Sequence, residues 1–158
     1  MPGATLLTQQ LNNFIRSLRE QGILDFHFEE LKELESDTPY LVVDAITMFL
    51  RDADCSIAEL LRTLGAPLIN YSRVTEIAFQ LKGSSSRTLI PFSAFGIAVL
   101  VVAGWPMPVV SFEMQVKHIP KKGFDRVRRE YLVLRENLNQ ILQMEHAINA
   151  FEPRRRHQ

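Results

Sequence analysis

Cysteine is almost absent from this chain, because Cys55 is the single one among 158 residues. No intramolecular disulfide can form, and no CxxC pair or cluster of cysteine and histidine offers structural zinc its usual ligands. This usage favours the reducing cytosol or nucleus over a secreted setting. Common enzyme motifs are missing too, since the sequence contains no GxSxG, HExxH, Walker loop or glycine-rich dinucleotide fingerprint. We therefore expect no metal, no cofactor and no hydrolase chemistry.

An excess of charge of one sign is also missing, since the 18 basic and 18 acidic residues cancel. A nucleic-acid-binding domain is normally basic throughout, so we expect no nucleic-acid partner. The signs are nevertheless segregated: residues 1–65 contain eleven acidic and five basic residues, and residues 66–158 contain seven acidic and thirteen basic ones. The asymmetry fits either a two-faced molecule that binds proteins or charge complementarity within one fold. The N-terminal stretch lacks the pattern of a signal peptide.

Apolar residues recur at the helical period through most of the chain. A first amphipathic stripe is followed by Gly22 as a stop signal, and it consists of Leu7, Leu11, Phe14 and Leu18. Asp25 offers an N-cap for a helix over residues 25–35, in which the apolar residues are spaced by three: Phe28, Leu31 and Leu34. The motif Asp37-Thr38-Pro39 signals the start of the next helix, over residues 38–64, which stops at Gly65-Ala66-Pro67.

The strongest helical pattern lies near the C-terminus. Its apolar seam alternates spacings of three and four and then resumes one heptad later, at Phe124, Val127, Tyr131, Leu134, Leu138, Ile141 and Ile148. Pro153 bounds this helix. Several amphipathic helices with short connections predict an all-α fold, an antiparallel four-helix bundle with additional N-terminal helices. We expect one domain over residues 1–152, followed by a basic tail over 153–158.

Residues 88–112 interrupt this helical order. No charged residue occurs between Thr88 and Phe112. About 20 apolar residues suffice to span a bilayer, so the segment raises a membrane-attached alternative. Prolines and glycines at five positions shorten its apolar core, which favours a buried segment instead: Pro91, Gly96, Gly104, Pro106 and Pro108.

The most informative segment is YSRVTEIAFQLKGSSSR, residues 71–87. At about 100° per residue, one helical face collects Val74, Ile77, Ala78 and Leu81, and this face is expected to be the buried one. Phe79 falls on the outward side, with Lys82 and Gly83 as neighbours. A large aromatic side chain beside a lysine and a glycine on the solvent side breaks the local pattern. It is either a singly exposed apolar residue, which is common, or part of a binding surface.

Several motifs resemble the plant histidine-containing phosphotransfer (HPt) proteins of the cytokinin phosphorelay. They are GILDFHFEELKEL (22–34), TMFLRDAD (47–54), FQLKGSSS (79–86) and the closing helix REYLVLRENLNQILQMEHAI (129–148). The run Gln-Leu-Lys-Gly-Ser-Ser-Ser is the specific one, because it seldom arises by chance. The resemblance implies an all-α protein with a central four-helix bundle, in agreement with the periodicity. It also implies a monomer in the cytoplasm and nucleus that binds receiver domains of sensor histidine kinases and response regulators.

One departure from the family motif concerns the site itself. In the family, the residue before Gln-Leu-Lys-Gly is the histidine that accepts phosphate from one receiver aspartate and passes it to the next. That position is Phe79 here. Phosphoryl transfer to a side chain needs a nucleophile, which imidazole supplies and a phenyl ring does not. The resemblance therefore implies a binding protein, not an enzyme, that acts as a non-phosphorylatable negative regulator of cytokinin signalling.

The neighbours of Phe79 form the expected partner-binding surface. By resemblance, Lys82 supplies positive charge beside the phosphoryl site, and Gly83 leaves room for the partner's backbone. Gln80 is expected to contact the partner or to pack beside this surface. Ser84 and Ser86, with Ser85 between them, would hydrogen-bond at its rim or form a polar turn.

A second departure follows Arg87, where the charge-free stretch replaces the Ser-Ile-Gly-Ala start and the charged helix of the family. We expect residues 87–112 either to derive from an alternative or misassigned exon or to pack as the third helix of the bundle. Two other functions stay open at this point. One is an active phosphorelay carrier that uses another acceptor residue, and the other is a small membrane-attached protein that inserts residues 88–112.

Overall fold

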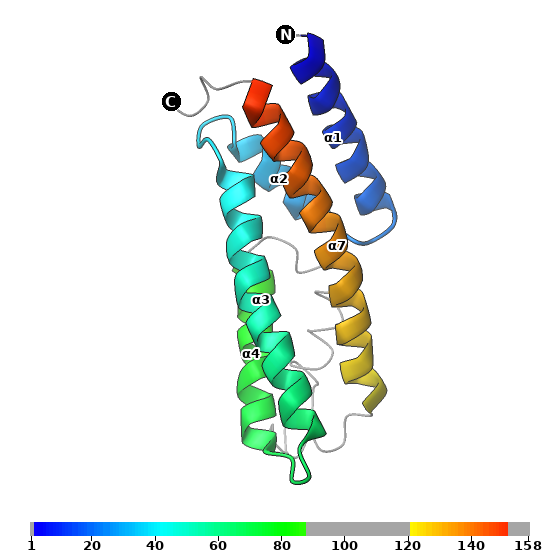
Figure 1. The fold of residues 1–158 in the computed structure, drawn as a ribbon, viewed down its shortest axis with the longest axis vertical. Helices are drawn as coiled ribbons and strands as arrows, with labels where there is room; N and C mark the ends of the chain where they lie inside the picture. The colour runs from blue at the N-terminus through cyan, green and yellow to red at the C-terminus, as the bar shows by residue number, and fades with distance from the viewer. Residues whose placement is uncertain (1, 88–120, 152–158) are drawn as a thin grey trace.

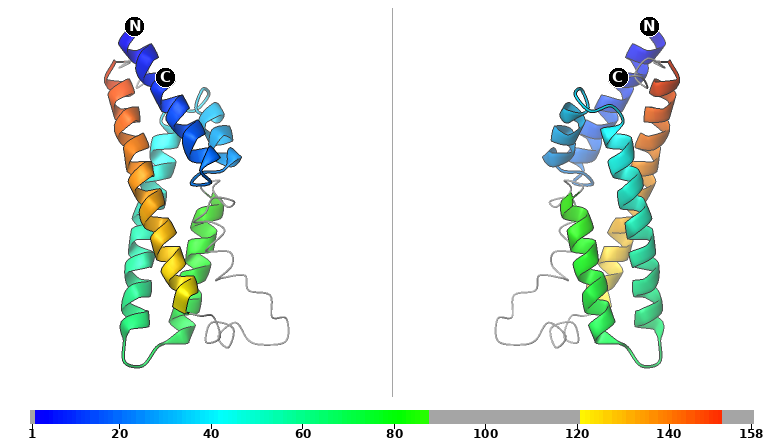
Figure 2. Two further views of the ribbon diagram at one scale, coloured as in Figure 1. Left: turned by 90° about the vertical axis from the view of Figure 1, so that its right-hand side faces the viewer. Right: turned by 90° about the vertical axis from the view of Figure 1, so that its left-hand side faces the viewer.

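A computed structural model describes residues 2–87 and 121–151, and this part of the chain consists of helices joined by short turns, with no strand (Figure 1). The helices are, in chain order, α1 (Pro2–Glu20), α2 (Phe26–Leu34), α3 (Leu41–Gly65), α4 (Tyr71–Arg87) and α7 (Lys121–Phe151). Helices α3 and α7 are the long ones. Figures 1 and 2 show α1 and α2 beside the upper parts of α3 and α7, and α4 along the lower part of α3. The predicted all-α bundle with additional N-terminal helices is confirmed for the described residues.

All five helices contribute to one hydrophobic core. The seam predicted for the last helix is confirmed, because each of its seven residues is at most 7% exposed in α7. The first stripe is confirmed in part: Leu11 and Leu18 are buried in α1, whereas Leu7 and Phe14 are half-buried at the edge of the core. Ile15 is buried as well, so the core face of α1 is centred on Leu11, Ile15 and Leu18, and Leu7 and Phe14 lie on its flank.

Helix α1 ends where Gly22 predicts. Gly22 adopts φ 76°, the left-handed region that glycine enters without steric cost. Its N–H donates to the carbonyl oxygen of Arg19 at 3.0 Å, and the N–H of Ile23 donates to that of Leu18 at 2.9 Å. These two bonds form a Schellman motif, which satisfies carbonyls left free at the helix end. The turn directs the chain back toward α2.

The cap of α2 is as predicted, but one residue of its apolar face is not. Asp25 is the N-cap, and its Oδ1 accepts from the N–H of His27 at 2.9 Å. Phe28 and Leu31 are buried, whereas Leu34 is 54% exposed, so the prediction that places Leu34 on the apolar stripe is wrong. The reason is geometric: each three-residue step falls about 60° short of a full turn, and two such steps carry the side chain off the core face.

The start of α3 differs from the prediction. The helix begins at Leu41 and not at Thr38 or Pro39, and its N-cap residue Tyr40 has φ 65° and makes no side-chain cap. The carboxylate of Glu35, at the end of α2, accepts from the N–H of Val42 at 3.1 Å instead. A free N–H of the first helical turn is thus satisfied from the preceding helix and not from the loop. The predicted stop at Gly65 is confirmed.

Residues 88–112, Pro153 and the tail lie outside the described residues. The expectations placed on them, including the membrane-attached alternative and the domain limits at 152 and 153, stay predictions. Among the described helices, none combines the length and apolarity that crossing a membrane requires.

Candidate functional site

Helix α4 presents its predicted faces. It is anchored at its start by Asn70, whose Oδ1 accepts from the N–H of Arg73 at 3.2 Å and whose carbonyl oxygen accepts from the N–H of Val74 at 3.1 Å. The predicted buried face is confirmed, with at most 3% exposure at Val74, Ile77, Ala78 and Leu81. Burying this face fixes the rotation of α4 about its own axis, so the residues on the opposite side point to solvent.

The exposed side of α4 is a continuous row of residues. We call it the α4 stripe, and it consists of Ser72, Glu76, Phe79, Gln80 and Gly83. Phe79 stands at its centre with 49% of its surface exposed. The prediction that this aromatic side chain lies on the outward side is therefore confirmed. A phenyl ring exposed to this degree is available to a partner, although single exposed apolar residues also occur on ordinary surfaces.

Lys82 lies next to the α4 stripe. Its Nζ is 6.0 Å from the centroid of the Phe79 ring, at the outer limit of a cation–π contact. Within the part of the chain that the structure describes, no carboxylate pairs with this ammonium group. The site therefore combines an exposed aromatic ring with a positive charge that remains available to an acidic partner.

The glycine and serine residues that follow are placed differently from one another. A Cβ built at Gly83 would meet nothing within 4 Å, so the backbone here is open to solvent, as expected. Ser84 is only 6% exposed, so it lies on the buried side of α4, and the hydrogen bond expected from its hydroxyl at the rim stays a prediction. Its helical position, three residues after Leu81, returns it to the buried side. Ser86 lies in the last turn of α4, and the proposed role of its side chain stays a prediction.

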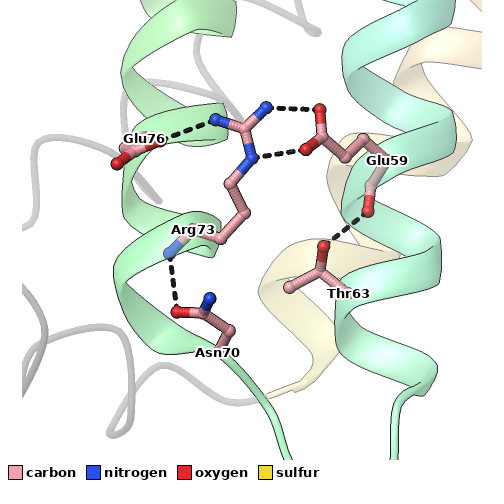
Figure 3. A network of polar contacts seen from close by, with 5 residues as sticks. All are labelled: Glu59, Thr63, Asn70, Arg73 and Glu76. Atoms are coloured by element: carbon pink, nitrogen blue, oxygen red, sulfur yellow. Dashed lines mark hydrogen bonds and ion pairs between the residues drawn. The ribbon is translucent and has the colours of Figure 1, made fainter.

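An ion-pair network near the start of α4 joins this helix to α3 (Figure 3). Arg73 binds both carboxylate oxygens of Glu59, with its Nη2 donating to Oε2 at 2.6 Å, and its Nη1 donates to Oε2 of Glu76 at 2.6 Å. The hydrogen bond to Glu59, and then the one to Glu76, raises the pKa of Arg73. The same bond from Arg73 holds the pKa of Glu59 below its usual range. The sequence pattern did not reveal this network, although the i, i+3 spacing of Arg73 and Glu76 is typical of an ion pair.

Two further polar clusters join α7 to α2 and to α3. Lys32 of α2 donates to Glu35 at 2.7 Å and to Oε1 of Glu145 in α7 at 2.5 Å. Tyr131 of α7 donates its hydroxyl proton to Asp54 of α3, which also accepts from Arg135. Glu145 is fully buried, and it occupies the seam position between Ile141 and Ile148 that the apolar pattern skips. The missing apolar residue at this seam position was the signal in the sequence that could have revealed the buried carboxylate.

The described histidines do not lie on α4. His27 belongs to α2, where its ring centroid is 4.0 Å from that of Phe26, and His146 is an exposed residue of α7. His118 and His157 lie outside the described residues. Among the described residues, no group of three or more histidine, cysteine or acidic side chains could hold a metal ion.

Comparison with known proteins identifies the family. No family model matches the chain. Histidine-containing phosphotransfer protein 1 of rice (Oryza sativa subsp. japonica) is 31% identical over 160 residues, which cover 96% of this chain and 98% of the rice protein. The chain belongs to the plant histidine-containing phosphotransfer family. Histidine-containing phosphotransfer protein 2 of rice is 28% identical over 157 residues, 96% of this chain and 97% of its own length.

Solved structures agree with the HPt fold. A rice histidine-containing phosphotransfer protein superposes with a TM-score of 0.77 at 27% identity, over 93% of this chain and 99% of that one. A maize protein of the same description gives a TM-score of 0.76 at 28% identity, over 90% and 99% of the two chains. The predicted family and fold are confirmed: this is an HPt-type phosphorelay protein of two-component signalling.

Proposed function

We propose that this HPt protein binds receiver domains of sensor histidine kinases and response regulators without accepting phosphate at position 79. It would then compete with HPt proteins that carry phosphate and act as a negative regulator of a two-component relay, which we propose is the cytokinin relay. We propose a monomer that acts in the cytoplasm and nucleus. The proposal rests on family membership together with the side chain at the acceptor position.

One observation carries the proposal: Phe79, half-exposed at the centre of the α4 stripe, precedes Gln-Leu-Lys-Gly. A phenyl ring has no lone pair with which to attack phosphorus, so a phosphoryl group cannot be transferred to it. In the described part of the chain, His27 and His146 belong to other helices and do not replace it. Position 79 is exposed but has no nucleophile, which supports binding of a receiver domain without transfer of a phosphoryl group.

The surroundings of Phe79 support retained binding. Lys82 offers a positive charge to the acidic pocket that holds the phospho-accepting aspartate of a receiver domain. The open backbone at Gly83 allows a partner to approach α4 closely. Buried residues on the opposite face hold the helix in place, so this surface needs no rearrangement before a partner binds.

A phosphotransfer assay tests the loss of the nucleophile. A receiver domain labelled with radioactive phosphate is incubated with the natural chain, with Phe79→His and with the polar control Phe79→Gln, and binding is measured in parallel. We expect all three proteins to bind and only Phe79→His to acquire acid-labile phosphate. Phosphate on the natural chain would establish an active carrier with another acceptor residue and would refute the proposal.

A charge reversal tests the position of the binding surface. We expect Lys82→Glu to weaken receiver binding, whereas the same reversal at the exposed Arg16 of α1 should not. Arg16 lies on a helix that packs on α7 and not on the α4 side of the bundle (Figure 1). Equal affinities of the two variants would show that the surface has been placed wrongly.

A further inference from the structure

Charges of opposite sign flank Phe79 along one ridge of α4. Glu76, Phe79 and Lys82 follow one another at intervals of three residues, and such rows form ridges on a helix surface. At 1.5 Å per residue, the acidic and basic ends are about 9 Å apart along the helix axis, and they point about 120° apart around it, with Phe79 between them. The side chain of Glu76 is 62% exposed. The ridge therefore presents an anionic group, an apolar ring and a cationic group in that order.

Arg73 keeps the acidic end of the ridge in a defined place. Its Nη1 holds Oε2 of Glu76 at 2.6 Å, while its other nitrogens bind Glu59 on α3 (Figure 3). The second oxygen of Glu76, Oε1, has no partner among the described residues. One guanidinium shared by two carboxylates leaves a net negative charge at this end. Glu76 is thus an oriented acceptor whose charge is only partly neutralised.

We propose that Glu76 is a second contact of the receiver domain, which binds a lysine or arginine side chain of that partner. This inference rests on the proposed function of the α4 stripe. Lys82 meets the acidic pocket of the receiver, and Glu76 meets a basic side chain about 9 Å away along the axis of α4. Two contacts of opposite sign fix the orientation of the partner, because the reversed orientation would pair like charges.

The same arrangement gives selectivity among receiver domains. A receiver with a basic residue at the matching place gains a charge-assisted hydrogen bond to Glu76. A receiver with an acidic residue there meets a like charge and is disfavoured. Arg73 acts as a positioning residue, since it holds the carboxylate in place and does not itself contact the partner.

Charge reversal at Glu76, with a remote control, tests the proposal. The affinity of a plant response-regulator receiver domain is measured by calorimetry for the full chain, for Glu76→Lys and for Glu20→Lys. Glu20 is an exposed residue at the end of α1, so both variants change the net charge equally. We expect Glu76→Lys to bind about three- to tenfold more weakly than Glu20→Lys, as is typical of a contact at the rim of an interface.

Two further measurements make the outcome decisive. Glu76→Gln keeps a hydrogen-bond acceptor and the size of the side chain, and we expect it to bind about twofold more weakly than the natural chain. Individual Lys→Glu and Arg→Glu variants of the receiver are then measured against the natural chain and Glu76→Lys. One of them should recover affinity only with Glu76→Lys, as a double-mutant cycle requires for a direct contact.

The possible results separate the two proposals. If the natural chain binds and Glu76→Lys matches Glu20→Lys, the second contact is refuted while the proposed function stands. If the natural chain does not bind the receiver at all, the proposed function is refuted and the contact with it. Melting temperatures show whether Glu76→Lys has a folding defect. If it has one, the affinity of Glu76→Gln is compared with that of the natural chain instead, because Arg73 retains both bonds to Glu59 in that variant.

Discussion

Replacing Lys32 with methionine is expected to destabilise the bundle strongly. Its ammonium group bonds to Glu35 at 2.7 Å and to Glu145 at 2.5 Å, and so ties α2 to α7. The side chains of Glu35 and Glu145 are 5% and 0% exposed. Removing the cation leaves two buried carboxylates without their counter-charge, and Oε2 of Glu145 already has no hydrogen-bond partner among the described residues.

The expected loss is about 3 kcal/mol of unfolding free energy. Breaking a fully buried ion pair costs about 3–5 kcal/mol, and we take the lower end. The reason is that 21% of the Lys32 side chain is exposed, so water screens part of the interaction. For a domain of this size, such a loss corresponds to a melting temperature lower by about 6–12 °C.

Urea and thermal unfolding followed by circular dichroism measure this effect. Arg19→Met is the matched control, because its pair with Glu29 at 3.1 Å is 41% and 36% exposed and should contribute less than about 1 kcal/mol. The double variant Lys32→Met, Glu145→Leu should recover part of the loss, since it removes one of the two buried carboxylates. A Lys32→Met protein as stable as Arg19→Met would refute the reasoning.

Two further variants give separate tests. Tyr131→Phe removes the hydrogen bond to Asp54 and should lower the unfolding free energy by about 1 kcal/mol at pH 7, measured in urea. Burial, and then Asp54, raise the pKa of Tyr131. The natural chain should therefore lose stability as the pH rises above about 10, where the tyrosine of the unfolded chain ionises. Tyr131→Phe should lose less stability over the same pH range. Gly83→Ala should raise the unfolding free energy by about 0.5–1 kcal/mol, because the added methyl group meets nothing within 4 Å and alanine favours a helix. The same methyl group should weaken receiver binding in calorimetry, and unchanged affinity would show that no partner approaches the backbone there.

Apolar spacing predicted the parts of the fold in which burial decides the structure. The α7 seam and the buried face of α4 follow directly from the helical period, because every side chain on those faces meets the same core. The orientation of Phe79 followed with them, since a residue opposite a buried face must point outward. The exposed aromatic ring at the site was therefore predictable from a rule about the core.

Contacts between distant helices could not be predicted in this way. Glu35 caps α3 from the end of α2, and Lys32 reaches Glu145, 113 residues away. A local pattern does not show which charged residue of another helix lies nearby. The sequence therefore predicts a start of α3 at Thr38, three residues before the observed start at Leu41. Ser84 shows a different limit, because the motif singles out its hydroxyl whereas its place on the helix decides its burial.

The first turn of α1 and the last turn of α7 lie together, at the end of the bundle away from α4 (Figure 1). A Cβ built at Gly3 would lie 3.5 Å from the Phe151 ring. A label, a surface anchor or a fused reporter attached before α1 would consequently stand clear of Phe79 and its neighbours. The protein can thus be immobilised by its N-terminal end with the α4 stripe facing the solution, which is the orientation that a binding sensor for receiver domains requires.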